Sequence, residues 1–267
     1  MSLLSTKRWS VGLSPHRVTL AQQGAFSAVK LVGSAVPSRP DWTAALATLE
    51  ELLPANASGQ LRVVVSSHWL RYQLLPWNDL LARRRDAQNV ARAHFAQVYG
   101  TSVSLGRVTL ADQGWGKPVL ACAIPEELEA LIETNAIRYG MKLEALVPDL
   151  HLLDYLRPST HKGSHAVLLG QPGLWILLAG ENGTTASVRH HRFAGDPIAA
   201  ADQLIRQEAL RLGLVEGFGR VDWLYPEDNR LIPGREFPAP TYLPRLPTRR
   251  GFSPATQGAF TFAVLGG

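Results

Sequence analysis

The chain has 267 residues, of which 46% are hydrophobic and 18% charged, and this balance excludes a disordered or membrane-embedded protein. A single cysteine, Cys122, excludes an internal disulfide and indicates a reducing compartment. Lys and Arg outnumber Asp and Glu by 27 to 22, so the net charge of +5 raises the question of a nucleic acid or an anionic membrane as partner.

The basic residues are mostly scattered along the chain. Their clusters are the triplet 83–85 and the tail arginines Arg245, Arg249 and Arg250, without the aromatic–basic alternation of a single-strand binder. We therefore expect a solvated basic surface and no nucleic-acid partner. The longest apolar stretch, residues 166–179, is interrupted by Gly and Pro, and the N-terminus lacks the apolar core of a signal peptide. The sequence predicts a cytoplasmic protein with no transmembrane segment.

Residues 1–150 contain the pattern of one α/β lobe. Apolar alternation predicts strands, and apolar positions at helical spacing between Pro, Asp and Gly residues predict helices. Strands are predicted over 9–20, 24–36, 61–75, 103–110, 118–123 and 142–147, and helices over 41–53, 79–99 and 125–139.

A similar order of elements begins again after residue 150. Strands are predicted over 166–170, 174–179, 186–193 and 221–225, and a helix over 197–212 follows the capping residue Asp196. Each half therefore has strand hairpins, a helix and a further strand, which indicates a duplicated topology without a sequence repeat. Residues 226–258 are rich in proline and predict an extended connection, and the apolar end of the chain predicts a short helix.

Two lobes built in this way resemble the actin-like ATPase superfamily. The segments LRVVVSSHWLRYQLLPW (61–77), HFAQVYG (94–100) and IRYGMKLEALVPDL (137–150) resemble the PilM and GspL group, which are actin-like cytoplasmic platform proteins of type IV pili and type II secretion. The terminal GAFTFAVLGG is similar to the last helix of PilM. The resemblance covers roughly residues 8–225 and implies a particular fold. It is an α/β, actin-like (ribonuclease H-like) fold of two lobes, with mixed sheets flanked by helices and a reduced second lobe.

This resemblance implies three parts along the chain: an N-terminal actin-like lobe over 1–150, a reduced second lobe over 151–225, and a proline-rich connection with a C-terminal segment over 226–267. An actin-like ATPase holds phosphate and its metal with two glycine-bearing hairpins, and it needs an acid near the metal. The first hairpin here contains Gly12 and Ser14, but Trp9 and Ser10 stand where the acid is expected.

The second glycine-bearing hairpin departs from the family in the same way. Gly170 and Gly173 are present, but Leu168 stands where the family has Asp, and a leucine side chain cannot coordinate Mg²⁺. The glycine pair expected beneath the adenosine is missing from residues 224–228. The resemblance therefore implies a degenerate nucleotide cleft, and we expect no catalytic residue, no metal and no cofactor.

Other catalytic patterns are weak. The chain has no phosphate-binding loop, dinucleotide fingerprint, HExxH or GxSxG motif. Ser66, Ser67 and His68 are consecutive on a predicted strand, so neighbours face opposite sides and cannot pair as nucleophile and base without a special turn. The same argument applies to His190 and His191 as metal ligands.

Aromatic side chains gather at the end of the strand predicted over 61–75. Trp69, Tyr72 and Trp77 lie there with Arg71, and aromatic residues and Arg are frequent anchors of interfaces. Packing behind the next helix is the competing explanation. In the PilM family a short cytoplasmic segment of a bitopic membrane protein docks into the N-terminal lobe, so the resemblance places a partner at these four residues.

Taken together, the residues and the resemblance imply a non-catalytic scaffold, a pseudo-ATPase that binds a bitopic inner-membrane protein and is peripheral to that membrane. Formation of a homodimer stays open. So do two alternatives: an ATPase or phosphotransferase of the same fold, with Asp149, Asp154 or Asp222 as the acid, and a basic nucleic-acid-binding protein.

Overall fold

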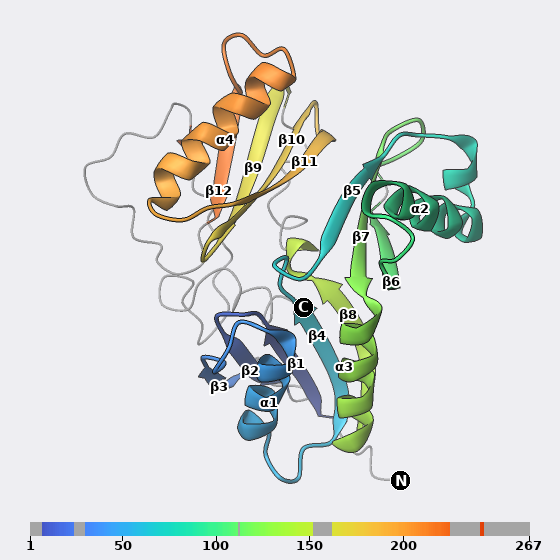
Figure 1. Ribbon diagram of the computed structural model, residues 1–267, viewed down its shortest axis with the longest axis vertical. Coiled ribbons are helices and arrows are strands. Elements are labelled where there is room, and N and C mark those ends of the chain that lie inside the picture. The colour runs from blue at the N-terminus through green and yellow to red at the C-terminus, as the bar shows by residue number, and fades with distance from the viewer. Residues whose placement is uncertain (1–6, 24–29, 112, 152–161, 225–240, 243–267) are drawn as a thin grey trace. The chain divides into compact units, whose positions relative to one another are not determined.

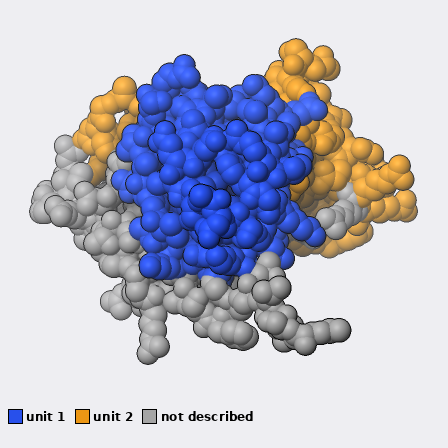
Figure 2. Space-filling model, turned by 90° about the horizontal axis from the view of Figure 1, so that it is seen from below, with its two compact units in different colours: residues 1–70, 124–152, 247–267 blue, residues 71–123, 153–246 orange. Residues whose placement is uncertain are grey.

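A computed structural model describes residues 7–23, 30–111, 113–151, 162–224 and 241–242. The chain divides into two compact units, coloured separately in Figure 2. Unit 1 comprises residues 1–70, 124–152 and 247–267, and unit 2 comprises residues 71–123 and 153–246. The predicted division by lobes, at residues 150 and 225, is a different partition and stays a prediction.

Unit 1 is built on a five-stranded mixed sheet in the order β3-β2-β1-β4-β8. Its strands are β1 (Arg8–Leu13), β2 (Val18–Gln23), β3 (Lys30–Ala35), β4 (Gly59–Val65) and β8 (Met141–Pro148). The first three strands are antiparallel neighbours, whereas β4 is parallel to both β1 and β8. Val11 lies opposite Leu20 and Val63, and all three are buried, so the sheet centre is apolar.

Helices connect the parallel strands of this sheet, as parallel pairing requires. Helix α1 (Trp42–Leu52) precedes β4, and Asp41 caps it by accepting a hydrogen bond from the Ala44 N–H at 2.7 Å. Helix α3 (Glu126–Arg138) precedes β8 and buries Leu128, Ile132 and Ala136, which are four residues apart and share one face.

Unit 2 contains a second five-stranded sheet, in the order β11-β10-β9-β12-β13. Its strands are β9 (Ser164–Gln171), β10 (Leu174–Glu181), β11 (Thr184–Arg192), β12 (Arg220–Leu224) and β13 (Thr241–Tyr242). Three antiparallel strands are again followed by parallel additions next to the first of them. The strand order of unit 1 is thus repeated, which confirms the predicted duplication of topology.

Helix α4 (Pro197–Arg211) covers one face of this second sheet (Figure 1). The core beneath it consists of alternate residues of the strands and one face of the helix. Its buried members are Ala166, Leu168, Trp175, Leu177, Ala179, Ala201, Leu204, Ile205, Ala209, Phe218, Val221 and Trp223. Trp175 is central: its ring packs edge-on against Trp223 at 4.9 Å, and its indole N–H donates to the Pro197 carbonyl at 2.8 Å. Apolar packing and a side-chain hydrogen bond therefore both attach α4 to the sheet.

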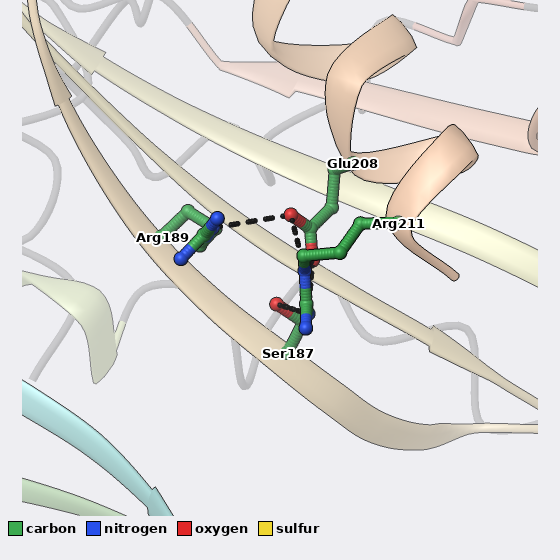
Figure 3. A network of polar contacts seen from close by, with 4 residues as sticks. All are labelled: Ser187, Arg189, Glu208 and Arg211. Atoms are coloured by element: carbon green, nitrogen blue, oxygen red, sulfur yellow. Dashed lines mark hydrogen bonds and ion pairs between the residues drawn. The ribbon is translucent and has the colours of Figure 1, made fainter.

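A polar network joins α4 to β11 (Figure 3). The Glu208 carboxylate is 2% exposed and accepts hydrogen bonds from the Arg211 guanidinium at 3.0 Å and from Arg189 at 3.2 Å. Arg211 also donates to the Ser187 hydroxyl at 2.7 Å. Burial by itself raises the pKa of Glu208, but the hydrogen bonds from Arg211 and Ser187 and the nearby positive charges lower it below the ordinary value.

We expect the Glu208→Gln substitution to lower the free energy of unfolding by about 1–2 kcal/mol at neutral pH, because two guanidinium groups lose their carboxylate partner. The loss is moderate because both guanidinium groups are half-exposed and stay hydrated. A lowered pKa in the folded state stabilises the fold above about pH 4.3, the ordinary Glu value, and this contribution is lost as pH falls further. Urea unfolding at neutral and acid pH should therefore show a flatter acid limb for the variant. The exposed Glu216→Gln is the control, and equal behaviour of both variants would contradict the prediction.

The remaining part of unit 2 is a three-stranded sheet, β5-β7-β6, with a helix against it. Its elements are β5 (Arg71–Leu75), the 3₁₀ turn η1 (Asp79–Ala82), α2 (Arg84–Tyr99), β6 (Leu105–Ala111) and β7 (Val119–Pro125). Ala87, Ala91 and Phe95 form the buried stripe of α2 and pack on alternate residues of the strands.

Three predicted elements are each divided in the structure. The strand predicted over 9–20 is the pair β1 and β2, because Pro15 and Ser14 form a turn between them. The strand predicted over 61–75 breaks after Val65, where Trp69 N–H donates to the Ser66 carbonyl in a turn. The helix predicted over 79–99 breaks at Arg83, whose backbone is extended. Those single-element predictions were wrong because apolar spacing continues across each turn.

Two further expectations concern the ends of the chain and its relation to a bilayer. The proline-rich connection and the terminal helix lie outside the described residues, apart from β13, which pairs with β12. Within the described ranges, no helix is both long and apolar enough to cross a membrane.

Candidate functional site

The carboxyl ends of β1, β4 and β8 meet at one edge of the unit 1 sheet. Leu13 is in register with Val65, and Val65 with Pro148. A polar residue follows each strand end: Ser14 after β1, Ser66 after β4 and Asp149 after β8. The carboxyl edge of parallel strands is where α/β proteins commonly bind ligands, so this edge is the candidate functional site of unit 1.

Asp149 joins the ends of β4 and β8. Its carboxylate accepts a hydrogen bond from the Ser67 backbone N–H at 3.0 Å and a second one from the Ser67 hydroxyl. Both side chains are buried, and a buried carboxylate is stable only when it is hydrogen-bonded. The Ser67 hydroxyl proton is directed at Asp149, so this contact fastens two strand ends together.

Three histidines follow the strand ends at this edge, His16, His68 and His151. The rings of His16 and His68 meet edge to face, with centroids 5.1 Å apart. His151 Nδ1 lies 2.7 Å from the Pro148 carbonyl, and its Nε2 lies 2.8 Å from the Arg62 guanidinium, which can only donate. In this arrangement Nδ1 donates to the Pro148 carbonyl and Nε2 accepts from Arg62. Among the described residues no three His, Cys, Asp or Glu side chains are grouped as a metal site would require.

The turn between β1 and β2 uses its N–H groups internally. Ser14 N–H donates to the Arg17 carbonyl at 3.1 Å, and His16 and Arg17 N–H groups donate to the Ser14 hydroxyl at 3.3 and 2.9 Å. Pro15 has no N–H. Phosphate groups bound by a protein loop usually accept from several such N–H groups, and here each N–H of residues 14–17 already has a partner in the turn.

The turn between β9 and β10 is a two-residue connection. Gln171 and Leu174 are already paired across the strands, so only Pro172 and Gly173 lie in the loop. Gly173 has a φ of +71°, a conformation that favours glycine, and its carbonyl accepts from the Phe193 N–H at 3.0 Å. Since Pro172 has no N–H, these two residues together offer one N–H at most.

No protein-family model and no curated protein matches this chain. Solved structures do. A Bacteroides thetaiotaomicron protein of actin-like ATPase fold and unknown function is similar over 82% of both chains, at 10% identity and a TM-score of 0.61. The cytoplasmic domain of EpsL, an inner-membrane component of the Vibrio cholerae type II secretion system, is similar over 98% of this chain and 96% of the EpsL chain, at 11% identity and a TM-score of 0.55. A chain of the PilM–PilN type IV pilus biogenesis complex is similar over 81% of this chain and 80% of its own length, at 15% identity and a TM-score of 0.54.

The chain has the actin-like ATPase fold. The two sheets with the same strand order agree with these similarities, and the predicted α/β class with mixed sheets flanked by helices is confirmed. The predicted resemblance to the PilM and GspL group is likewise consistent with the EpsL and PilM structures.

The two hairpins predicted to bear the family's glycines are β1–β2 and β9–β10. Gly12 is buried on β1 between Thr19 and Val64, and Gly170 lies on β9 opposite Trp175. Leu168, predicted to stand in place of the family's Asp, is fully buried in the core beneath α4. The predicted loss of nucleotide chemistry at these positions stays a prediction.

The acids required by the enzyme alternative are engaged where they can be described. Asp149 is bonded to Ser67, as shown above. Asp222 is 1% exposed, and both of its carboxylate oxygens contact the Arg220 guanidinium at 2.7–3.0 Å. Asp154 lies outside the described residues.

The four residues predicted to bind a partner fall in both units. Trp69 belongs to unit 1 and packs edge-on against Trp42. In unit 2 the Arg71 guanidinium lies 4.9 Å from the Tyr99 ring centroid, and Tyr72 is buried with its ring against His190. Trp77 is half-buried. Their role in binding stays a prediction.

Two features of the site were missed in the sequence. The Ser67–Asp149 link could not be recognised, because the pairing of β4 with β8 joins residues 82 positions apart. Trp115, which is 76% exposed and packs against Trp77, was not singled out either. The signal in the sequence was the position of Trp115 between Gly114 and Gly116, because a side chain in a glycine turn lies outside the strands and does not pack within the sheet.

Proposed function

We propose that this chain is a non-catalytic platform protein of a type IV pilus or type II secretion-like machine, located in the cytoplasm and held at the inner membrane by partners. It binds a short cytoplasmic segment of a bitopic membrane protein through the surface around Arg71 and Trp77. It does not hydrolyse ATP.

The observation that carries this proposal is the state of the two hairpins. The N–H groups of the first turn already donate to the Ser14 hydroxyl and the Arg17 carbonyl, and the second turn is a Pro–Gly connection with one N–H at most. The position of the family's Asp is a core leucine. A nucleoside triphosphate with Mg²⁺ needs hydrogen-bond donors for its phosphates and oxygen ligands for its metal, and the residues of these two hairpins offer few donors and few oxygen ligands.

Structural similarity supports the platform role. The EpsL cytoplasmic domain and this chain cover each other almost completely, so no large part of either lacks a counterpart. The PilM structure comes from a complex with PilN, which supports a protein partner for the same fold.

Thermal unfolding with and without Mg-ATP and Mg-ADP tests the catalytic half of the proposal. We expect no shift of the melting temperature. A ligand at about 100 times its Kd stabilises by about 2.7 kcal/mol, which is roughly 5–10 °C for a protein of this size. A shift of that size would overturn the proposal in favour of an ATPase or phosphotransferase.

Titration with synthetic peptides tests the partner half. The probes are the cytoplasmic N-termini of single-span proteins encoded beside this gene, and we expect one of them to raise the melting temperature. Arg71→Ala should weaken that peptide's binding about ten-fold, whereas Arg206→Ala, an exposed arginine of α4, should leave it unchanged. Equal peptide binding by both variants would show that the surface around Arg71 is not the binding site. If the chain instead binds DNA in a salt-sensitive way and binds no peptide, the nucleic-acid-binding alternative replaces the proposal.

A further inference from the structure

Trp115 stands at the tip of the β6–β7 hairpin of unit 2. It is 76% exposed, an unusual state for a large aromatic side chain. Gly114 and Gly116 flank it with φ of +103° and +75°, conformations that favour glycine. The turn therefore displays the indole away from the sheet rather than folding it into the core.

The hairpin that carries Trp115 is braced at its base. Lys117 N–H donates to the Gly114 carbonyl at 3.2 Å and closes the turn. The Gln113 side chain donates to the Pro118 carbonyl at 2.8 Å and exchanges two hydrogen bonds with the Thr185 backbone, at 3.1 and 2.6 Å. An exposed Trp held on a braced turn loses little conformational entropy on binding.

A second apolar group lies close to this tip. The Trp77 ring packs against Trp115 with centroids 4.9 Å apart, and Leu80, three residues further on, is 53% exposed. From Trp77 to Arg83 the chain passes through η1, which rises about 2 Å per residue over residues 79–82, and the extended residues on either side bring the largest separation of the two Cα atoms to about 17 Å. The indole, Leu80 and the basic end of η1 are thus parts of one surface region.

Positive charge is concentrated in the same part of the chain. Residues 71–123 contain seven Lys and Arg against three Asp, so this segment carries a charge of +4 out of the chain's +5. Arg83, Arg85 and Lys117 are exposed there, and the acids Asp79 and Asp86 precede and follow the two arginines in the sequence. An exposed Trp beside exposed cations is the combination found at membrane–water interfaces, where the ring lies among the headgroups and basic side chains meet anionic lipids.

We propose that the tip at Trp115, with Leu80, Arg83, Arg85 and Lys117, is a contact surface for an anionic phospholipid bilayer. A bilayer is preferred over a protein pocket for two reasons. Trp115 projects from a turn, whereas a residue that dominates a protein–protein interface is usually surrounded by further contact residues. The cations also come from two segments, the start of α2 and the β6–β7 turn, a spread that an extended charged surface can meet all at once. This surface goes beyond the proposed function and does not depend on it.

Flotation of the full chain with vesicles tests this inference. We expect binding to phosphatidylglycerol vesicles at about 0.1 M salt, weaker binding at higher salt, and none to phosphatidylcholine vesicles. Each basic side chain near such a surface contributes roughly five-fold in affinity, so the double variant Arg83→Glu/Arg85→Glu should bind at least about 30-fold more weakly. Trp115→Ala should lose about ten-fold. Lys142→Glu, which reverses one exposed basic charge on β8 of unit 1 and so makes half of the charge change of the double variant, is the control and should bind as the wild type does.

Insertion of the indole has its own readout. Brominated acyl chains should quench part of the tryptophan fluorescence of the wild type, and this part should be missing in Trp115→Phe. If the wild type does not bind phosphatidylglycerol vesicles, or if both the Trp115 and arginine variants bind them unchanged, the inference is overturned, and Trp115 is then an anchor for a protein. The assay contains neither nucleotide nor peptide, so its failure leaves the proposed function standing.

Discussion

Replacing Leu168 by Asp should destabilise the fold by at least about 4 kcal/mol, a large fraction of the roughly 5–15 kcal/mol that stabilises a typical domain. Leu168 is fully buried on β9, in register with Leu177 on β10 and Trp223 on β12, beneath α4. A carboxylate there has no water, and it also leaves part of the leucine volume empty. An acid at this position would therefore disrupt the core and not create a metal ligand.

Urea unfolding of the purified chain measures this loss directly. Leu168→Met is the matched control, because a hydrophobic residue of similar volume should cost less than about 1.5 kcal/mol. Both variants should also be heated with Mg-ATP. A Leu168→Asp protein that unfolds at the wild-type midpoint and gains a nucleotide-dependent shift would show that the position still faces a working cleft.

The two hairpins and the core are consistent with one another in physical terms. A Leu at 168 extends the apolar layer that Trp175 and Trp223 form beneath α4. A Pro–Gly connection begins four residues later, at Pro172, and it is short enough to need no further support. In unit 1 the Ser14 hydroxyl accepts from the N–H groups of His16 and Arg17. The residues of both hairpins thus make their contacts within the chain.

Much of this fold could be predicted from the sequence because its signals are local. The capping residues Asp41 and Asp196 begin α1 and α4 as predicted, and Gly100 ends α2. The turns inside predicted strands were missed although Pro15 was a usable signal, since proline cannot donate within a central strand. Arg83 carries no such signal, because apolar spacing runs through the break.

The candidate site was harder to predict because its parts come from different strands. The order β1-β4-β8 is set by tertiary packing, and only this order brings Ser67 to Asp149. In the sequence Ser67 is one of three consecutive polar residues on a predicted strand, and Asp149 is one of three candidate acids for the enzyme alternative. Neither residue, taken alone, indicates the other.

Asp149→Ala should lower the free energy of unfolding by about 3 kcal/mol. The Ser67 N–H and hydroxyl are fully buried, and without the carboxylate both donors lose an acceptor, at about 1–3 kcal/mol for each buried group left unsatisfied. Asp149→Asn keeps one side-chain oxygen as an acceptor, so we expect roughly half of that loss. Urea unfolding of the three proteins gives the order wild type, Asn variant, Ala variant.

Asp79→Ala is the matched control, because Asp79 is exposed in η1 and its removal should change stability by less than about 0.5 kcal/mol. The same variants separate the structural role of Asp149 from the catalytic one that the enzyme alternative requires. If Asp149 fastens β4 to β8, the Ala and Asn variants differ from the wild type in stability and in nothing that Mg-ATP changes. If it instead serves a metal, the wild type alone is stabilised by Mg-ATP and the Asn variant unfolds at the wild-type midpoint without nucleotide, because its buried hydrogen bonds would then contribute little.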